Sequence, residues 1–480
     1  MKAWLAHQAQ RRPEATALVQ GKQRLAWAEL AEHAAQHAAM LYALGVQPDD
    51  RVFLQARPNL RSAIWMHAIL WLGAVLVPLD PDLASARTRK LVERLRPAAM
   101  IATDPGALRR DSAVESCPIV DASTLPDPRL TPLDPTPYAP ARLATIMLTS
   151  GSTAEPRAVP LTLENHRAST LSIARRVGMT DSDQWLLCLP LNHIGGLAVL
   201  IRSAVTGSAV SIQPGFEPVS ILHALADGPH TLTSMVPTML QRLLDRQTAP
   251  VPTDLRVLLI GGAPAAPALL QRARDLGWPV LPTWGMTEAC SQLVTMSPPE
   301  ARQMDFEDSP GIAGRPLDGV EVRSGPNGTL EVRGPMLFSG YLDAGGGPNA
   351  EGWFSTGDTG EFLPDGNLRI IGRVDDVIIS GGVNVNLEAV RRHLAECSRV
   401  RDVFLVALPD TCWGQRIGAV VQPQDLKADP EALRSFLVDW SRQRLMPAER
   451  PLKWRIVDNI PTSTAGKALK PACAALFETD

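Results

Sequence analysis

Residues 149–160, TSGSTAEPRAVP, bring hydroxyl-bearing and small side chains together directly after an apolar run. That run, residues 144–148 (ATIML), is typical of a buried strand. Gly151 lets the backbone turn sharply, and successive backbone N–H groups in such a turn bind anions, with the hydroxyls as further donors. The segment therefore predicts a phosphate-binding loop, although by itself it is also compatible with a plain turn. It is not a Walker loop, because no Gly-Lys-Ser/Thr follows.

This segment resembles the phosphate loop of the acyl-adenylate-forming superfamily, which includes acyl-CoA synthetases, adenylation domains of peptide synthetases and luciferases. The usual form is TSG-[ST]-TG-x-PKG, and this chain has Ala154 for glycine, Arg157 for lysine and Ala158 for glycine. Arg157 keeps the charge but presents a planar fork instead of a point charge. The resemblance implies that the loop binds ATP through Thr149, Ser150, Gly151, Ser152, Thr153 and Arg157.

A second match to the superfamily combines residues 261–264 (GGAP) with residues 283–289 (TWGMTEA). The resemblance implies that this region holds the adenine, and Trp284 in place of the usual tyrosine can still stack on a purine. It implies that Thr287 bonds the α-phosphate and that Glu288 is a magnesium ligand, since a hard cation prefers oxygen donors. The nucleotide-binding candidates of this region are Gly262, Ala263, Pro264, Trp284 and Gly285.

Three further stretches match in the same order along the chain, namely STGD at 355–358, GRVDDVIISGGVNVNLE at 372–388 and PTSTAGKALK at 461–470. The resemblance implies that Asp358 accepts hydrogen bonds from the ribose hydroxyls and that Arg373 contacts the ribose or the phosphates. It also implies a hinge at Asp375 and a lysine, Lys467, that reaches the active site during adenylation and neutralises developing negative charge. The backbone offered to the pantetheine arm of CoA would be that of Ser380, Gly381 and Gly382.

Substrate selection is expected from residues 190–202, which begin PLNHIGG. This stretch resembles the superfamily's PLFHxxG gate with Asn192 for the aromatic residue, and the resemblance implies that His193 lines the acyl pocket. A core histidine bonded to backbone is the alternative for His193. Arg202 stands in an apolar run, where a buried charge needs a partner. This region resembles the corresponding region of o-succinylbenzoate–CoA ligases, in which a basic residue at this spacing binds the second carboxylate of the substrate.

The resemblance implies an ATP-dependent acid–thiol ligase that uses Mg²⁺ and forms an acyl-AMP and then an acyl-CoA thioester. O-succinylbenzoate, of menaquinone biosynthesis, is the expected acid. One alternative is an aryl- or fatty-acyl ligase of another pathway that loads CoA or a carrier protein. Another, from a different class, is an inactive nucleotide-binding relative with a regulatory role.

The elements that position these residues indicate an α/β protein. Helical and strand patterns alternate up to about residue 319, which predicts a largely parallel sheet, and short strands with glycine turns follow. We expect a large N-terminal adenylation domain (1–373) with a β-rich subdomain, and a small, mobile α+β domain (374–480). His33 and His37 are interpreted as histidines on an exposed helix face, not as a metal site.

Composition narrows the class of protein and its partners. The net charge of −3 gives no basic excess for nucleic acid. The six cysteines are scattered without a CxxC pair, which fits a reducing compartment, and the N-terminus has no signal-peptide pattern. We expect a cytoplasmic protein whose partners are small molecules, without a membrane span.

Overall fold

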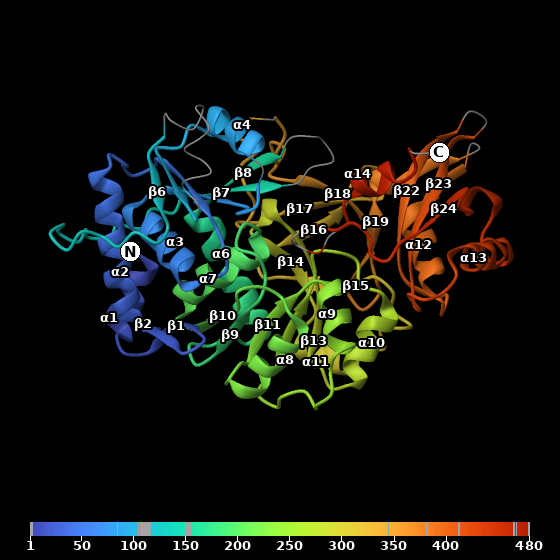
Figure 1. Ribbon diagram of the computed structural model, residues 1–480, viewed down its shortest axis with the longest axis horizontal. Coiled ribbons are helices and arrows are strands. Elements are labelled where there is room, and N and C mark those ends of the chain that lie inside the picture. Colours follow the sequence, from blue (N-terminus) through green and yellow to red (C-terminus); the bar gives the residue numbers. More distant parts are fainter. Residues whose placement is uncertain are drawn as a thin grey trace.

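The computed structural model describes residues 3–83, 85–103, 105, 117–149, 156–343, 345–380, 383–410, 413–463, 466 and 468–478. Its strands form three β-sheets, and Figure 1 shows the third of them, with the C-terminal helices, at one end of the long axis. The chain is α/β, as the alternating patterns predicted.

A six-stranded sheet carries the predicted phosphate loop at one edge, in the order β6-β5-β3-β4-β7-β8. Its strands are parallel except for the antiparallel pair β7–β8, which closes the edge. The apolar run at residues 144–148, which predicted a buried strand, lies in β7 and is largely buried. The strands are β3 (Arg51–Gln55), β4 (Val75–Leu79), β5 (Ala99–Ala102), β6 (Ile119–Asp121), β7 (Leu143–Thr149) and β8 (Arg157–Thr162).

A thirteen-stranded sheet changes from parallel to antiparallel pairing in its middle, in the order β16-β17-β18-β19-β15-β14-β13-β12-β11-β9-β10-β1-β2. Strands from β13 to β1 are parallel neighbours, and the ends of the sheet are antiparallel. The parallel part and its end hairpin comprise β1 (Thr16–Gln20), β2 (Gln23–Ala26), β9 (Gln184–Leu187), β10 (Ala209–Ile212), β11 (Leu232–Met235), β12 (Val257–Ile260) and β13 (Val280–Met286). The antiparallel part comprises β14 (Ser291–Thr295), β15 (Ile312–Pro316), β16 (Glu321–Ser324), β17 (Thr329–Arg333), β18 (Phe354–Phe362) and β19 (Leu368–Arg373). Antiparallel pairing therefore begins at β13–β14, about thirty residues before residue 319, up to which the alternating pattern predicted parallel strands.

Helices cover these two sheets and bury a large apolar core, and a second, smaller apolar cluster packs on the six-stranded sheet. Helix α6 begins at a capping box formed by Thr162 and Asn165 and ends at Gly178 in the left-handed conformation. The helices of this part are α1 (Trp4–Arg11), α2 (Trp27–Ala43), α3 (Leu60–Leu72), α4 (Ser85–Leu95), α6 (Leu163–Val177), α7 (Ile194–Thr206), α8 (Pro218–Asp227), α9 (Pro237–Leu244), α10 (Pro267–Asp275) and α11 (Pro298–Gln303), with the 3-10 turns η2 (Thr287–Ala289) and η3 (Pro326–Gly328).

The C-terminal unit has its own five-stranded sheet and its own apolar clusters. The single turn η4 (Val374–Asp376) connects β19 of the large sheet to β20 of this one, which is where the hinge is predicted. The elements of the C-terminal unit are β20 (Val377–Ser380), β21 (Val383–Asn386), β22 (Val400–Asp410), β23 (Gly414–Pro423), β24 (Lys453–Ile456), α12 (Leu387–Ala395), α13 (Pro430–Arg444), η5 (Pro447–Glu449) and α14 (Lys470–Ala475). The domain limits at 373/374, and the mobility of the small unit, stay predictions.

The interpretation of the histidine pair on α2 needs one correction. His37 is buried, with its ring 4.5 Å from that of Trp65 on α3, so only His33 is on the more open side of the helix. Burial lowers the pKa of His37, which keeps its ring neutral. Among the described residues, no group of three or more metal-ligating side chains is present.

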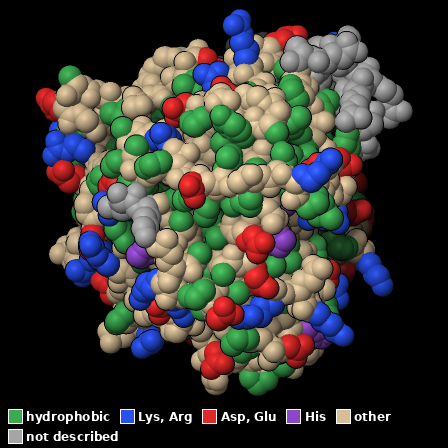
Figure 2. All heavy atoms as spheres, turned by 90° about the vertical axis from the view of Figure 1, so that its left-hand side faces the viewer, with side chains coloured by type: hydrophobic (Ala, Val, Ile, Leu, Met, Phe, Trp, Pro, Cys, Tyr) green, Lys and Arg blue, Asp and Glu red, His purple; other side chains and the backbone are tan. Residues whose placement is uncertain are grey.

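Surface charges are mixed in sign. Figure 2 shows positive and negative side chains interspersed over the described part of the face that carries the N-terminal helices. Within the described part of the chain, no helix is long and apolar enough to cross a membrane.

Candidate functional site

Several of the predicted site residues lie at one edge of the thirteen-stranded sheet. Strands β9, β11, β12 and β13 are parallel, so their carboxyl ends lie at the same edge, where α/β sheets bind ligands. His193 is the N-cap of α7, which follows β9. The segment with Gly262, Ala263 and Pro264 follows β12, and Trp284 lies near the carboxyl end of β13.

Trp284, Asp358 and Arg373 form a connected group. The indole Nε1 of Trp284 donates a hydrogen bond to Oδ2 of Asp358 at 2.7 Å. Nη1 of Arg373 donates to Oδ1 of Asp358 at 2.9 Å, and the two residues are also directly paired across β18 and β19. The carboxylate is 14% exposed and the guanidinium 48%. Three residues predicted to hold the adenosine are therefore in contact, although they are up to 89 positions apart in the sequence.

Glu288 lies in η2, next to Thr287, and is joined to a residue that the sequence analysis did not identify. The hydroxyl of Tyr341 donates a hydrogen bond to Oε1 of Glu288 at 2.7 Å. The Arg157 guanidinium carbon lies 5.1 Å from the centre of the Tyr341 ring. Tyr341 is one of only three tyrosines in the chain, and it stands in a glycine-containing loop, the one signal that could have drawn attention to it.

The predicted phosphate loop connects β7 to β8. Thr149 ends β7 and pairs with Arg157, the first residue of β8. Arg157 and Ala158, which replace the usual lysine and glycine, are therefore strand residues, with Arg157 exposed and Ala158 buried. The other predicted loop ligands, Ser150, Gly151, Ser152 and Thr153, lie outside the described residues, as does Ala154.

Two glycines of the predicted adenine-binding region are required by the structure for different reasons. Gly262 has φ +82°, in the left-handed region, which suits glycine in the turn after β12. A Cβ on Gly285 would lie 1.7 Å from the backbone oxygen of Ser291, so the β13–β14 pairing itself requires glycine there. The packing of Gly285 is thus explained without a ligand, and its nucleotide-binding role stays a prediction.

The C-terminal loop that carries the predicted catalytic lysine meets the same edge of the sheet. Lys467 lies outside the described residues, but its neighbour Gly466 contacts the start of α9, which follows β11. The Thr238 hydroxyl donates a hydrogen bond to the Gly466 oxygen at 3.4 Å, and Arg401 of β22 forms an ion pair of 2.5 Å with Asp245 at the end of α9. The small unit therefore contacts both ends of α9, and its Gly466 contact lies just after the carboxyl end of β11.

The residues predicted for the hinge and for CoA are only partly described. The backbone of Asp375 lies in η4, beside Asp376, whose carboxylate receives Lys470 at 3.3 Å. Ser380 is fully buried at the end of β20 and pairs with Gly414 of β23. Gly381 and Gly382 lie outside the described residues.

Arg202 lies on α7 and is almost completely enclosed, with 1% of its surface exposed. Its Nη2 donates a short hydrogen bond to Oε1 of Gln292, a residue that the sequence analysis did not identify. Its guanidinium carbon lies 5.7 Å from the ring of Trp185. In the described part of the chain, its Nε and Nη1 have no hydrogen-bond partner, and no carboxylate forms an ion pair with it. Burial lowers the pKa of Arg202 to about 10, so the group is still charged at neutral pH.

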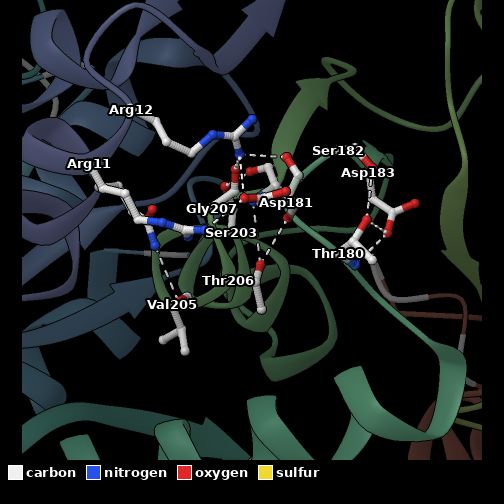
Figure 3. A network of polar contacts seen from close by, with 12 residues as sticks. Arg11, Arg12, Thr180, Asp181, Ser182, Asp183, Ser203, Val205, Thr206 and Gly207 are labelled. Carbon is white, nitrogen blue, oxygen red and sulfur yellow. Dashed lines mark hydrogen bonds and ion pairs between the residues drawn. The ribbon is translucent and has the colours of Figure 1, made fainter.

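The end of α7 is fixed by the N-terminal helix, as Figure 3 shows. Nη1 of Arg12 donates to the backbone oxygens of Asp181 at 2.6 Å and Gly207 at 2.9 Å. Arg11 forms an ion pair with the Asp181 carboxylate at 3.1 Å. The Thr206 hydroxyl donates to the backbone oxygen of Arg202 at 2.8 Å. These contacts help to hold the last turns of α7, which carry Arg202.

Comparison with known proteins identifies the family. The model of the AMP-binding enzyme family matches residues 5–342, and that of the AMP-binding enzyme C-terminal domain matches residues 392–467. The chain belongs to the AMP-binding enzyme family. The 2-succinylbenzoate–CoA ligase of Bacillus licheniformis is 31% identical over 97% of this chain and 98% of the relative, and that of Bacillus subtilis is 32% identical over 97% and 96%.

Solved structures of the family are similar over the whole chain. The o-succinylbenzoate CoA synthetase (MenE) of B. subtilis in complex with the acyl-adenylate OSB-AMP has a TM-score of 0.89 and 28% identity, covering 100% of this chain and 98% of that one. The same synthetase with ATP and magnesium ion has a TM-score of 0.87 and 28% identity, covering 99% of each chain. The predicted α/β fold with a small C-terminal unit is thereby confirmed, as is the prediction of an AMP-forming acid–thiol ligase.

The magnesium ion that this family uses is compatible with the residues present. Mg²⁺ keeps several waters and is held by one or two carboxylates together with substrate phosphates, so it does not need a cage of protein ligands. Glu288 is half-buried, at the expected edge of the sheet, with one oxygen oriented by Tyr341. One ordered carboxylate of this kind fits a metal that arrives with ATP.

Proposed function

We propose that this chain activates 2-succinylbenzoate with Mg·ATP and transfers the acyl group to CoA. Curated relatives that are 31–32% identical over nearly the whole chain carry the name of this ligase. The acid and the acceptor are the parts of this proposal that need a test, because the family includes ligases for many acids.

The observation that carries the choice of acid is the environment of Arg202. Its Nε and Nη1 have no hydrogen-bond partner in the described part of the chain, and an enclosed guanidinium of this kind is costly unless an anion pairs with it. The acid 2-succinylbenzoate has two carboxylates, of which one is activated and the other is free to form such a pair. A monocarboxylic acid would leave Arg202 as it is in the unliganded protein.

In the first half-reaction, a substrate carboxylate oxygen attacks the α-phosphorus of ATP and pyrophosphate leaves. Asp358 and Arg373 hold the ribose, and Trp284 provides an aromatic face for the adenine. Lys467 neutralises the charge that develops on the phosphate oxygens, and Thr287 donates to them. Mg²⁺, when bound at Glu288, stabilises the charge on the phosphates.

In the second half-reaction, the small unit rotates about Asp375 and the CoA thiolate displaces AMP from the acyl carbon. The protein supplies no covalent nucleophile, so positioning and charge stabilisation account for catalysis. Rotation requires the Arg401–Asp245 ion pair and the Gly466–Thr238 contact to open.

The test is pyrophosphate release with two acids that differ in one group. One is 2-succinylbenzoate, and the other is 4-oxo-4-phenylbutanoate, the same acid without its ring carboxylate. We expect kcat/KM to be on the order of 100-fold higher for the diacid, because only its ring carboxylate can form a charged hydrogen bond with the buried Arg202. Thioester formation with added CoA tests the acceptor. Equal rates for the two acids would contradict the assignment of the acid.

A further inference from the structure

Tyr341 lies between two oppositely charged groups that are expected to act on the triphosphate. Its hydroxyl donates to Oε1 of Glu288 at 2.7 Å, and the Arg157 guanidinium lies 5.1 Å from its ring centre. We propose that Tyr341 is a positioning residue, which orients Glu288 for the magnesium of Mg·ATP and seats Arg157 beside the phosphates. This inference rests on the proposed function, since it concerns the same nucleotide site.

The backbone around Tyr341 is bonded to both of the elements that it would position. The Phe338 N–H donates to the backbone oxygen of Glu288 at 2.8 Å, in η2. The Leu342 N–H donates to the backbone oxygen of Ala158 at 3.1 Å, one residue after Arg157 on β8. Residues 338–342 therefore connect the segment of the predicted metal ligand to the strand that follows the phosphate loop.

The ring of Tyr341 is fixed by packing. It meets the Phe338 ring edge-on, with 4.9 Å between centres and 73° between planes. Phe338 is 1% exposed and packs in the same way on Phe354 at 5.1 Å. A ring held in one orientation holds its hydroxyl in one place, so the bond to Glu288 does not depend on a mobile side chain.

The chemistry of the hydroxyl suits an orienting role. The phenol hydroxyl is a hydrogen-bond donor, and its 2.7 Å bond commits Oε1 of Glu288. Mg²⁺ requires near-ideal octahedral geometry, and a carboxylate whose rotation is fixed by an outer hydrogen bond meets that demand better than a free one.

The ring also gives a reason for arginine at position 157. A planar guanidinium stacks on an aromatic face, whereas an ammonium is a compact, strongly hydrated point charge. Arg157 begins a strand and is exposed, so the contact with Tyr341 restricts where its charge lies. Tyr341 thus acts on both charges of the site.

The substitution Tyr341→Phe isolates the hydroxyl, because it keeps the ring, its contact with Phe338 and the stacking of Arg157. ATP binding is measured by titration calorimetry without acid, once with Mg²⁺ varied and once with EDTA. We expect the Mg²⁺ concentration for half-maximal ATP affinity to rise roughly 10- to 100-fold, the usual effect of removing an outer partner of a ligand. Affinity in EDTA should stay unchanged, and the Tm of the unliganded protein should fall by no more than the loss of one hydrogen bond implies, a few degrees.

The matched control is Tyr138→Phe. The Tyr138 hydroxyl likewise donates to a glutamate, Oε2 of Glu164 at 3.1 Å, but this pair lies between the N-terminal helix and α6. Tyr138→Phe should leave the Mg²⁺ dependence as in the wild type. A Glu288→Gln background should abolish the effect of Tyr341→Phe, since the two residues act as one unit.

Three outcomes would overturn the inference: an unchanged Mg²⁺ dependence in Tyr341→Phe, an equal loss of affinity in EDTA, or additive effects of the two substitutions. Failure of the proposed function looks different, because the wild-type protein itself would then bind no Mg·ATP or release no pyrophosphate with the diacid.

Discussion

The two ends of the candidate site satisfy their charges in different ways. At the nucleotide end, Asp358 is bonded by Trp284 and Arg373, and Glu288 by Tyr341. At the acid end, Arg202 is 1% exposed, and two of its nitrogens have no hydrogen-bond partner among the described residues.

This difference indicates what holds the side chains of each end in place, the protein itself or the bound ligand. The nucleotide end is arranged by protein contacts before ATP arrives, so binding has little to reorganise. The acid end keeps a buried charge that lowers stability until a ligand pairs with it, which is a usual exchange of stability for function. Substitutions at the two ends should therefore affect stability with opposite sign.

The largest effect is expected for Arg202→Met, which replaces the charge by an apolar side chain of similar length. The kcat/KM for 2-succinylbenzoate should fall about 1000-fold, because a buried charged pair with the substrate is lost. The KM for ATP should stay within a factor of about three. Stopped or coupled pyrophosphate assays measure both.

The same variant should be at least as stable as the wild type in urea denaturation, since removing a poorly paired buried charge is neutral or stabilising. A loss of several kcal/mol in the absence of substrate would show that the protein itself satisfies Arg202, and the comparison of the two ends would fail.

The second effect is expected for Asp358→Ala at the nucleotide end. It removes the acceptor of the Trp284 N–H and one hydrogen-bond acceptor of Arg373, together with the predicted ribose ligand. The Kd for ATP should therefore rise about 100-fold and stability should fall by about 1–2 kcal/mol. Calorimetric ATP titration and urea denaturation give the two numbers. Asp439→Ala is the control, because its ion pair with Arg442 is exposed on α13. Unchanged ATP affinity in Asp358→Ala would remove Asp358 from the site.

The third prediction concerns pH and the neighbourhood of Arg202. Burial, and then the charge of Arg202, lower the pKa of His166 to about 3, and its Nε2 lies 2.9 Å from the hydroxyl of Thr145. Between about pH 6.5 and 3 the unfolded chain binds a proton there that the folded chain does not, so stability falls as pH falls. At pH 5 this contribution is about 2 kcal/mol.

Urea denaturation at pH 7 and pH 5 tests it with His166→Gln, which should reduce the loss between these pH values by about that amount. His67, whose pKa burial lowers to about 4, contributes with the same sign and stays in the variant. If Arg202→Met leaves the share of His166 in the pH dependence unaltered, Arg202 carries no charge that His166 senses.

The smallest effect is expected for Arg12→Gln, at the network in Figure 3. Loss of the bonds to the backbone oxygens of Asp181 and Gly207 should lower the free energy of unfolding by about 1 kcal/mol. The ratio of kcat/KM between the two acids should change less than threefold, because α7 keeps its other contacts. A loss of acid selectivity as large as that in Arg202→Met would show that the helix end, and not the charge, determines selectivity.

Much of the fold could be predicted from the chain because its signals are local. The strand at residues 257–260 has four successive apolar residues, and the helix-forming composition of α2 ends near Gly45, so the signals for both elements lie within the segments themselves. The pairing direction of β13 and β14 was not predicted, because register and direction depend on partners distant in sequence. His37 was misplaced for the same reason, since Trp65 covers it from another helix.

By itself, the sequence determined the family, the class of reaction and the candidate residues, because short motifs carry chemistry through residue type and spacing. Only the tertiary structure showed that Asp358 is held by Trp284 and Arg373, that Tyr341 joins Glu288 to Arg157, and that Arg202 is enclosed without a carboxylate partner among the described residues. The reason is physical: burial and hydrogen-bond satisfaction depend on which distant segments pack together, and no single segment of the chain contains that information.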